Sequence, residues 1–184
     1  MSLEAIGTLS GLANVWLTTR QNIWCWPVGL VYIFVSYVVF FKVRLYAELG
    51  TNTVYLILTF YGWYYWLRGG KDEQPLSVTR LRPQDVWLLL GLNLLCVTLM
   101  GAALDRFTNN AFPYVDSAVA MLSYTAMGLQ AKKKLENWVL WCVVNVVSMA
   151  MYMRQGIFLY AALCGVFLVL AIRGHELWKR SVLR

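Results

Sequence analysis

Apolar residues form seven long runs along the chain, and short polar or basic segments separate them. A helix of about 20 residues, rising ~1.5 Å per residue, spans the ~30 Å hydrocarbon core of a bilayer. Several runs reach or approach that length. The pattern predicts transmembrane helices over residues 3–19, 23–41, 45–67, 83–104, 115–131, 138–153 and 157–178. We therefore expect an all-α, polytopic membrane protein in which residues 1–184 form a single transmembrane domain.

The composition supports membrane embedding and excludes several other classes. Of the 184 residues, 60% are hydrophobic and 14% are charged, whereas soluble domains carry about 25% charged residues. The net charge is +7, but the basic residues lie between the apolar runs, so we expect no nucleic-acid partner. The four cysteines fall inside apolar runs without C-x-x-C spacing, which argues against a disulfide framework or a zinc site. The first run carries Glu4 and no basic residue before it, so we expect a retained helix and not a signal peptide.

The basic residues divide unequally between the two sides of the predicted helices. With seven crossings, successive connections between helices lie on alternating sides of the membrane. Twelve of the sixteen basic residues then lie on one side, and the other four, on the opposite side, are Lys42, Arg44, Arg106 and Arg154. Basic residues concentrate on the cytoplasmic side of membrane proteins. The N-terminus is therefore expected outside and the C-terminus in the cytoplasm.

Three short motifs occur twice, in the same order. Residues 22–26 resemble 137–141, residues 45–47 match 159–161, and residues 62–68 match 174–180, at offsets of 115, 114 and 112. Two three-helix copies have the same orientation in the membrane only if an odd number of helices, here one, links them. We predict a 3+1+3 parallel-repeat arrangement, which is a known transporter architecture, with repeat one at about 3–67, the linking helix at about 83–104 and repeat two at about 115–178.

Large aromatic and amide side chains share helix faces. Helical spacing places five residues of the third predicted helix on one face, and three residues of the sixth on another. Rings stack on a flat ligand, amides orient it, and ring faces attract a cation. For the tryptophans the alternative is anchoring at the membrane interface, and for the asparagines it is hydrogen bonding between helices. The candidate substrate-binding residues are Trp26, Asn52, Tyr55, Trp63, Trp66, Trp138, Trp141 and Asn145.

No motif in the sequence indicates catalysis. We find no nucleophile–base pair, no metal-ligand spacing and no phosphate-binding glycine loop. The chain is expected not to be an enzyme and to hold neither a cofactor nor a metal. The predicted helices carry no carboxylate near their midpoints, where a coupling ion would bind, so any transport is expected to be facilitated diffusion.

Several of these stretches resemble the PnuC-type nicotinamide riboside transporters of bacteria. The matching segments are Leu45-Tyr46-Ala47, Tyr61-Gly62-Trp63-Tyr64-Tyr65-Trp66, Phe112-Pro113 with Asp116-Ser117, and Glu136-Asn137-Trp138-Val139-Leu140-Trp141 with Asn145. The resemblance implies a fold related to the SWEET sugar transporters, a homotrimer in the bacterial inner membrane, and functional coupling to a cytoplasmic kinase that traps the substrate. It also assigns substrate contacts to Trp63, Trp66, Trp138, Trp141 and Asn145.

This chain departs from the family pattern at two positions. Asn52 stands where a glutamine is expected, and Cys164 stands where a tyrosine is usual. Both changes shorten the side chain and leave room for a different or larger ligand. The leading hypothesis is facilitated diffusion of nicotinamide riboside into the cytoplasm, and thiamine or another nucleoside-like vitamin is the alternative. The competing class is a membrane scaffold or assembly protein, and a membrane enzyme ranks third.

Overall fold

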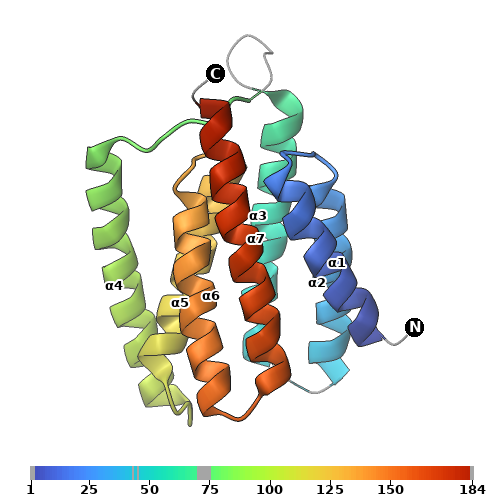
Figure 1. The fold of residues 1–184 in the computed structure, drawn as a ribbon. Helices are drawn as coiled ribbons and strands as arrows, with labels where there is room; N and C mark the ends of the chain where they lie inside the picture. The colour runs from blue at the N-terminus through green and yellow to red at the C-terminus, as the bar shows by residue number, and fades with distance from the viewer. Residues whose placement is uncertain (1–2, 43, 45, 70–75, 183–184) are drawn as a thin grey trace.

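The computed structural model describes residues 3–42, 44, 46–69 and 76–182 (Figure 1). Seven helices make up the fold: α1 (Leu3–Thr19), α2 (Cys25–Lys42), α3 (Tyr46–Arg68), α4 (Pro83–Phe107), α5 (Pro113–Ala131), α6 (Asn137–Arg154) and α7 (Phe158–Val182). The described residues contain no strand beyond a single isolated bridge. The prediction of an all-α fold with seven helices is confirmed.

The helix ends differ from the predicted ones by up to four residues, for local reasons. α2 begins at Cys25 because the Asn22 side chain accepts the Trp24 N–H at 2.9 Å and holds a turn there. α5 begins two residues early because Pro113 suits the first helical position. α7 continues to Val182, since the basic residues of its last turn suit the negative end of the helix dipole.

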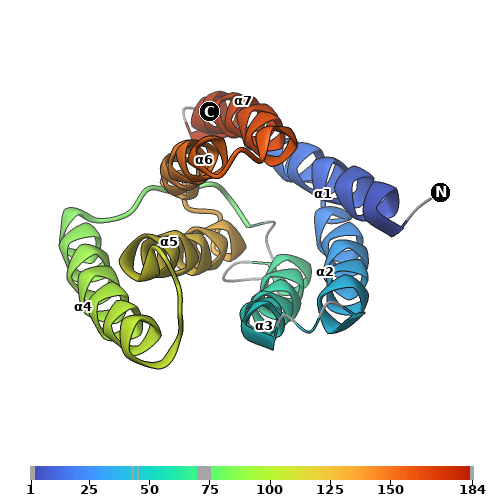
Figure 2. The same cartoon turned by 90° about the horizontal axis from the view of Figure 1, so that it is seen from below.

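Helices α1, α2, α3, α5, α6 and α7 form a closed ring through their contacts, and α4 lies outside it (Figure 2). Neighbours in the ring follow the order α1, α2, α3, α5, α6, α7, and α7 packs back against α1. α4 packs against α5 alone among its substantial contacts. In Figure 1, α1–α3 and α5–α7 run through the same sequence of directions, and α4 makes the return pass between them. This arrangement agrees with the predicted 3+1+3 repeat.

Three helices of the described chain, α2, α4 and α7, are long and apolar enough to cross a membrane by length and composition. The other four are diluted by polar residues that are buried or half-buried within the ring, among them Asn14, Asn52, Gln130 and Asn145. Because these helices lie beside α2 and α7 in one ring, they cross the same layer. The chain is a multi-pass membrane protein.

The connections that meet at the end of the bundle near the C-terminus form what we call the basic end. Gln21, in the α1–α2 turn, donates to Ser181 at 3.1 Å and accepts from Lys133 of the α5–α6 turn at 3.4 Å. Thr79, in the extended segment 76–82, donates its N–H to the Lys133 carbonyl at 3.1 Å. The rest of the loop predicted at 68–82 includes residues 70–75, which lie outside the described residues. No pattern in the sequence indicates the bridge between Thr79 and Lys134.

The two repeats share backbone features at a constant offset of 112 residues. Gln21 and Lys133 both have a positive φ, of 55° and 48°, and each lies in the turn after the first helix of its repeat. Arg44 and Gly156, after the second helix, have φ of 57° and 75°. Backbones 112 residues apart therefore turn in the same way.

Packing fixes the same offset for α2 and α6. A Cβ on Gly62 would overlap the Trp26 ring, and a Cβ on Gly174 would meet the Trp138 ring at 2.5 Å. Trp26 is thus the counterpart of Trp138, and the offset of 115 predicted for this motif is wrong. The offset of 115 pairs Trp26 with Trp141 instead of Trp138.

Candidate functional site

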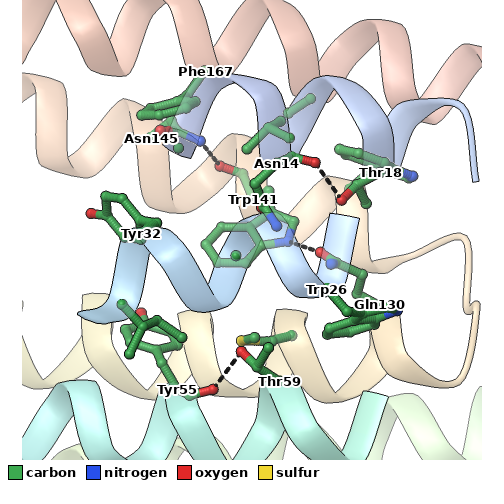
Figure 3. A pocket seen from close by; sticks show the side chains of 17 residues that line it. Asn14, Thr18, Trp26, Tyr32, Tyr55, Thr59, Gln130, Trp141, Asn145 and Phe167 are labelled. Carbon is green, nitrogen blue, oxygen red and sulfur yellow. Dashed lines mark hydrogen bonds between the residues drawn. The ribbon is translucent and has the colours of Figure 1, made fainter. Parts of the chain in front are cut away.

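A cavity of about 240 Å³ lies inside the ring (Figure 3). Its volume is just below the ~300–1,000 Å³ of typical small-molecule sites. Every ring helix contributes to its wall, and α4 contributes nothing. The 17 lining residues are Gly11, Asn14, Val15, Thr18, Trp26, Gly29, Tyr32, Ile33, Tyr55, Thr59, Met127, Gln130, Trp138, Trp141, Asn145, Phe167 and Ala171.

The cavity sits where the two repeats meet. Fourteen of its lining residues form seven pairs separated by 112 positions: Val15 and Met127, Thr18 and Gln130, Trp26 and Trp138, Gly29 and Trp141, Ile33 and Asn145, Tyr55 and Phe167, Thr59 and Ala171. Only the tryptophan pair is identical. The two repeats therefore form one cavity with symmetric backbone positions, and they line its two halves with different side chains.

Two positions show how the chemistry of the two halves differs. Trp141 takes the position of Gly29 in repeat one, where the Asn14 side chain packs on the glycine and would lie 2.7 Å from an added Cβ. Asn145 places an amide where repeat one has Ile33. A flat ligand is offered the Trp141 ring and the Asn145 amide from repeat two, and the Asn14 amide and the Tyr55 ring from repeat one.

The Trp141 ring is held in the cavity by its neighbours. Its Nε1 donates to the Gln130 side-chain oxygen at 3.3 Å. The Asn145 amide nitrogen donates to the Trp141 carbonyl at 2.8 Å, which directs the amide along α6 (Figure 3). No described residue donates to the Asn145 Oδ1, which remains available as an acceptor.

Four tryptophans close the cavity at the basic end. Trp26 meets Trp66 edge-on, with ring centroids 5.5 Å apart, and Trp138 meets Trp178 in the same way at 5.4 Å. Trp66 and Trp178 then contact each other at 6.3 Å. Edge-to-face pairs stabilise by about 0.5–1.5 kcal/mol beyond their buried area. All four rings belong to the main buried cluster, which we call the tryptophan cluster.

Two members of the tryptophan cluster tie the repeats together through hydrogen bonds. The Trp66 Nε1 donates to the Ala131 carbonyl at 3.0 Å, and the Trp178 Nε1 donates to the Thr18 carbonyl at 3.1 Å. Each bond starts in one repeat and ends in the other. By contrast, the Nε1 groups of Trp26 and Trp138 are buried and meet no acceptor in the described part of the chain.

The structure brings five of the eight predicted site residues to the cavity wall: Trp26, Tyr55, Trp138, Trp141 and Asn145. Trp66 lies inside the tryptophan cluster, and Trp63 is half-buried against it. Asn52 is 5% exposed, lies one turn from Tyr55, and finds no partner for its Nδ2 among the described residues. These three do not line the cavity.

Sequence reasoning missed several polar lining residues, notably Asn14, Thr18 and Gln130. Each lies in or near the last turn of α1 or α5, where no periodic motif marks it. The repeat could have identified two of them, because Thr18 and Gln130 are 112 residues apart and therefore occupy equivalent positions in the two repeats.

No residue that lines the cavity carries a formal charge. Among the cations of the basic end, Lys133 is 9% exposed and places its Nζ 4.5 Å from the Trp66 ring centroid. Burial lowers the pKa of Lys133. The cavity itself is aromatic, amide-bearing and neutral.

A ring of membrane helices around a neutral aromatic cavity, on the axis relating two repeats, defines the class of small-molecule membrane transporters. A family model described as nicotinamide mononucleotide transporter matches residues 1–180, and the chain belongs to this family. The resemblance noted from the sequence motifs is thereby confirmed. Membership decides against the scaffold and enzyme alternatives.

Characterised relatives match almost the whole chain. The nicotinamide riboside transporter PnuC of Escherichia coli (strain K12) is 28% identical over 204 residues, covering 97% of this chain and 85% of that protein. The riboflavin/roseoflavin transporter RibM of Streptomyces davaonensis is 24% identical over 185 residues, with the same coverage. The crystal structure of the vitamin B3 transporter PnuC has a TM-score of 0.79 at 21% identity, and the match covers 99% of this chain and 82% of that one. This last likeness supports the fold.

Proposed function

We propose that this protein carries nicotinamide riboside across the membrane by facilitated diffusion. The observation that carries the proposal is the neutral, aromatic cavity at the centre of the ring. Nicotinamide riboside joins a flat, positively charged ring to an uncharged sugar. Ring faces attract a cation without needing a carboxylate, and the Gln130 and Asn145 amides suit the carboxamide and hydroxyl groups of such a ligand.

The same neutrality argues for a nucleoside and against a nucleotide. A phosphate buried in this cavity would meet no lysine or arginine, and burying an unpaired charge is costly. A substrate that is phosphorylated in the cytoplasm would then no longer fit. This supports the functional coupling to a cytoplasmic kinase that traps the substrate. Nicotinamide mononucleotide should fail to compete for uptake, and equal competition by it would contradict this assignment.

The cavity wall supports facilitated diffusion, because it holds no carboxylate, histidine, lysine or arginine that could bind a coupling ion. Uptake into proteoliposomes should persist when proton and sodium gradients are dissipated. A strict requirement for either gradient would exclude this mechanism.

The site is tested by removing one amide from the cavity and one from outside it. Asn145 and Asn93 both donate to the carbonyl four residues earlier, at 2.8 Å each, but Asn93 lies on α4. Asn145→Leu should reduce uptake of nicotinamide riboside at least tenfold, a loss of about 1.4 kcal/mol. Asn93→Leu should transport normally. Equal losses in both variants would show that the Asn145 amide acts only in folding.

Thiamine and flavins are the alternative substrates. Thiamine is also a flat cation, and a relative of this chain is named as a riboflavin transporter. Calorimetric titration of the purified protein with nicotinamide riboside, thiamine and riboflavin separates these ligands. Tightest binding of thiamine or riboflavin would reassign the substrate.

For the cellular arrangement we propose a homotrimer in the bacterial inner membrane, with the N-terminus outside and the C-terminus cytoplasmic. Support for the orientation comes from the basic end, which holds the Arg20 turn, the lysine triplet after α5 and the last turn of α7. A C-terminal fluorescent fusion should be active in the cytoplasm, and an alkaline phosphatase fusion there should be inactive. Light scattering of the purified protein should give the mass of three chains.

A further inference from the structure

A second cavity, of about 260 Å³, lies on the seam between α1 and α7 at the basic end. Its wall consists of Trp16, Thr19, Arg20, Leu170, Arg173, Glu176, Leu177 and Arg180. We call it the seam groove. Trp16 is 48% exposed and Leu177 is 45% exposed, so the groove opens on the outer surface of the ring, away from the central cavity. In a membrane protein this surface faces lipid.

Positive charge is in excess in the seam groove. Three arginines and one glutamate leave a net charge of +2. Within the described part of the chain, no carboxylate lies within 4.0 Å of the guanidinium groups of Arg20, Arg173 or Arg180. The Arg20 guanidinium lies 4.7 Å from the centre of the Trp16 ring, which holds it beside the groove. Arginine binds phosphate oxygens in a bidentate manner, and here its donors are free to do so.

The groove also changes from charged to apolar along its length. Arg173, Glu176, Leu177 and Arg180 share one face of α7 by helical spacing. Leu170 lies ten residues before Arg180, about 15 Å deeper along the helix. A ligand with a charged head and an apolar tail matches this order, with the head at the arginines and the tail along Leu170 and Trp16.

The repeat does not generate this groove automatically. The equivalent seam, between α3 and α5, carries Tyr61 and Tyr64 at the positions of Arg173 and Glu176. Arg68, the counterpart of Arg180, stacks over the Tyr64 ring at 5.0 Å. Arg20 has a basic counterpart in Lys132, so among the three arginines only Arg173 lacks one. The α1–α7 seam therefore differs from its counterpart at Arg173, which adds a third basic residue.

We infer that the seam groove binds the phosphate of an anionic phospholipid from the leaflet at the basic end. Arg173 and Arg180 hold the phosphate, and the glycerol and first acyl segment lie along the apolar part of the groove. Juxtamembrane basic residues attract anionic lipids by about 1 kcal/mol each. A groove with two arginines on one helix face adds a defined stoichiometry of one lipid per chain.

The test compares thermal unfolding of the full-length protein in detergent with added phosphatidylglycerol, phosphatidylcholine or inorganic phosphate. Phosphatidylglycerol should raise the Tm of the wild type, and the other two should not. The double variant Arg173→Gln, Arg180→Gln should need at least ten times more phosphatidylglycerol than the wild type to reach half of the Tm rise. The matched control, Arg68→Gln with Arg82→Gln, removes two charges at the same end outside the groove and should behave as the wild type.

Three outcomes would overturn the inference. Equal loss in the control pair would mean that the whole basic end attracts lipid without a site. An equal shift with inorganic phosphate would assign the groove to a free phosphate. An unchanged lipid dependence in the Arg173→Gln, Arg180→Gln variant would exclude the groove. Arg173→Lys keeps the positive charge but loses the planar guanidinium group, so it should retain part of the Tm rise with phosphatidylglycerol. Native mass spectrometry of this variant should then find fewer chains with one bound lipid than in the wild type.

Discussion

Substituting Gly174 by alanine tests whether the wall of the central cavity is set by the packing of α7 against α6. The new Cβ would lie 2.5 Å from the Trp138 ring, and ordinary contact begins at 3.4 Å. The ring must therefore retreat by about 0.9 Å. Trp138 is 1% exposed, and Trp178 packs edge-on against it. The free direction is into the cavity, because Trp138 also forms part of its wall.

The cost is that of overpacking a closed core, about 1–3 kcal/mol. For a chain of this size that lowers the Tm by about 3–10 °C. The ring also enters space that the ligand needs, so the KM for uptake should rise by roughly tenfold or more. Gly128→Ala is the matched control, since a Cβ there meets nothing within 4 Å. Alanine is favoured over glycine in a helix by about 1 kcal/mol, so the control should be neutral or stabilising.

Uptake kinetics in proteoliposomes and thermal unfolding of the same preparations give the two readouts. If Gly174→Ala unfolds at the wild-type temperature and transports with the wild-type KM, the close contact with Trp138 does not shape the cavity. If Gly128→Ala is impaired equally, the effect belongs to glycine in general.

Three other outcomes are expected. Trp66→Phe removes the hydrogen bond to Ala131, whereas the Trp26 indole N–H has no acceptor in the described chain. Trp66→Phe should therefore cost about 1–3 kcal/mol more stability than Trp26→Phe. Equal Tm losses in the two variants would contradict this. Gln130→Leu removes the acceptor that orients Trp141 and should lower affinity in calorimetry while leaving the Tm within a few degrees; unchanged affinity would show that the bond is dispensable. Burial lowers the pKa of Lys133, so between that pKa and 10.5 the unfolded chain binds more protons than the folded one, and stability rises with pH. The Tm of the wild type relative to Lys133→Gln should therefore rise from pH 8 to pH 10. A constant Tm difference would refute the assignment.

The helices and the repeat could be predicted from sequence because both leave periodic signals. Apolar runs set the number of helices, and Gly62 with Trp66, matched by Gly174 with Trp178, gave the correct offset of 112. The offsets of 115 at residues 22–26 and 114 at residues 45–47 were wrong, because short matches of aromatic and small residues do not fix the register of two helices.

The site could be predicted only in part, because one helix face serves more than one purpose. The face of α3 from Asn52 to Trp66 covers fourteen residue steps, about 21 Å. The cavity meets only its middle, at Tyr55 and Thr59, and the end near Trp66 packs in the tryptophan cluster. Spacing identifies the inward face but not the depth at which a ligand lies. That depth depends on how six helices pack together.

The lack of formal charge in the central cavity has an electrical consequence. When a cationic ligand crosses in such a cavity, no protein charge moves with it, so each transport event carries one elementary charge across the bilayer. That charge is worth about 2.3 kcal/mol per 100 mV, which corresponds to roughly 50-fold accumulation on the negative side. A passive carrier of this kind concentrates its substrate by using the voltage alone, and a neutral analogue of the same shape would only equilibrate.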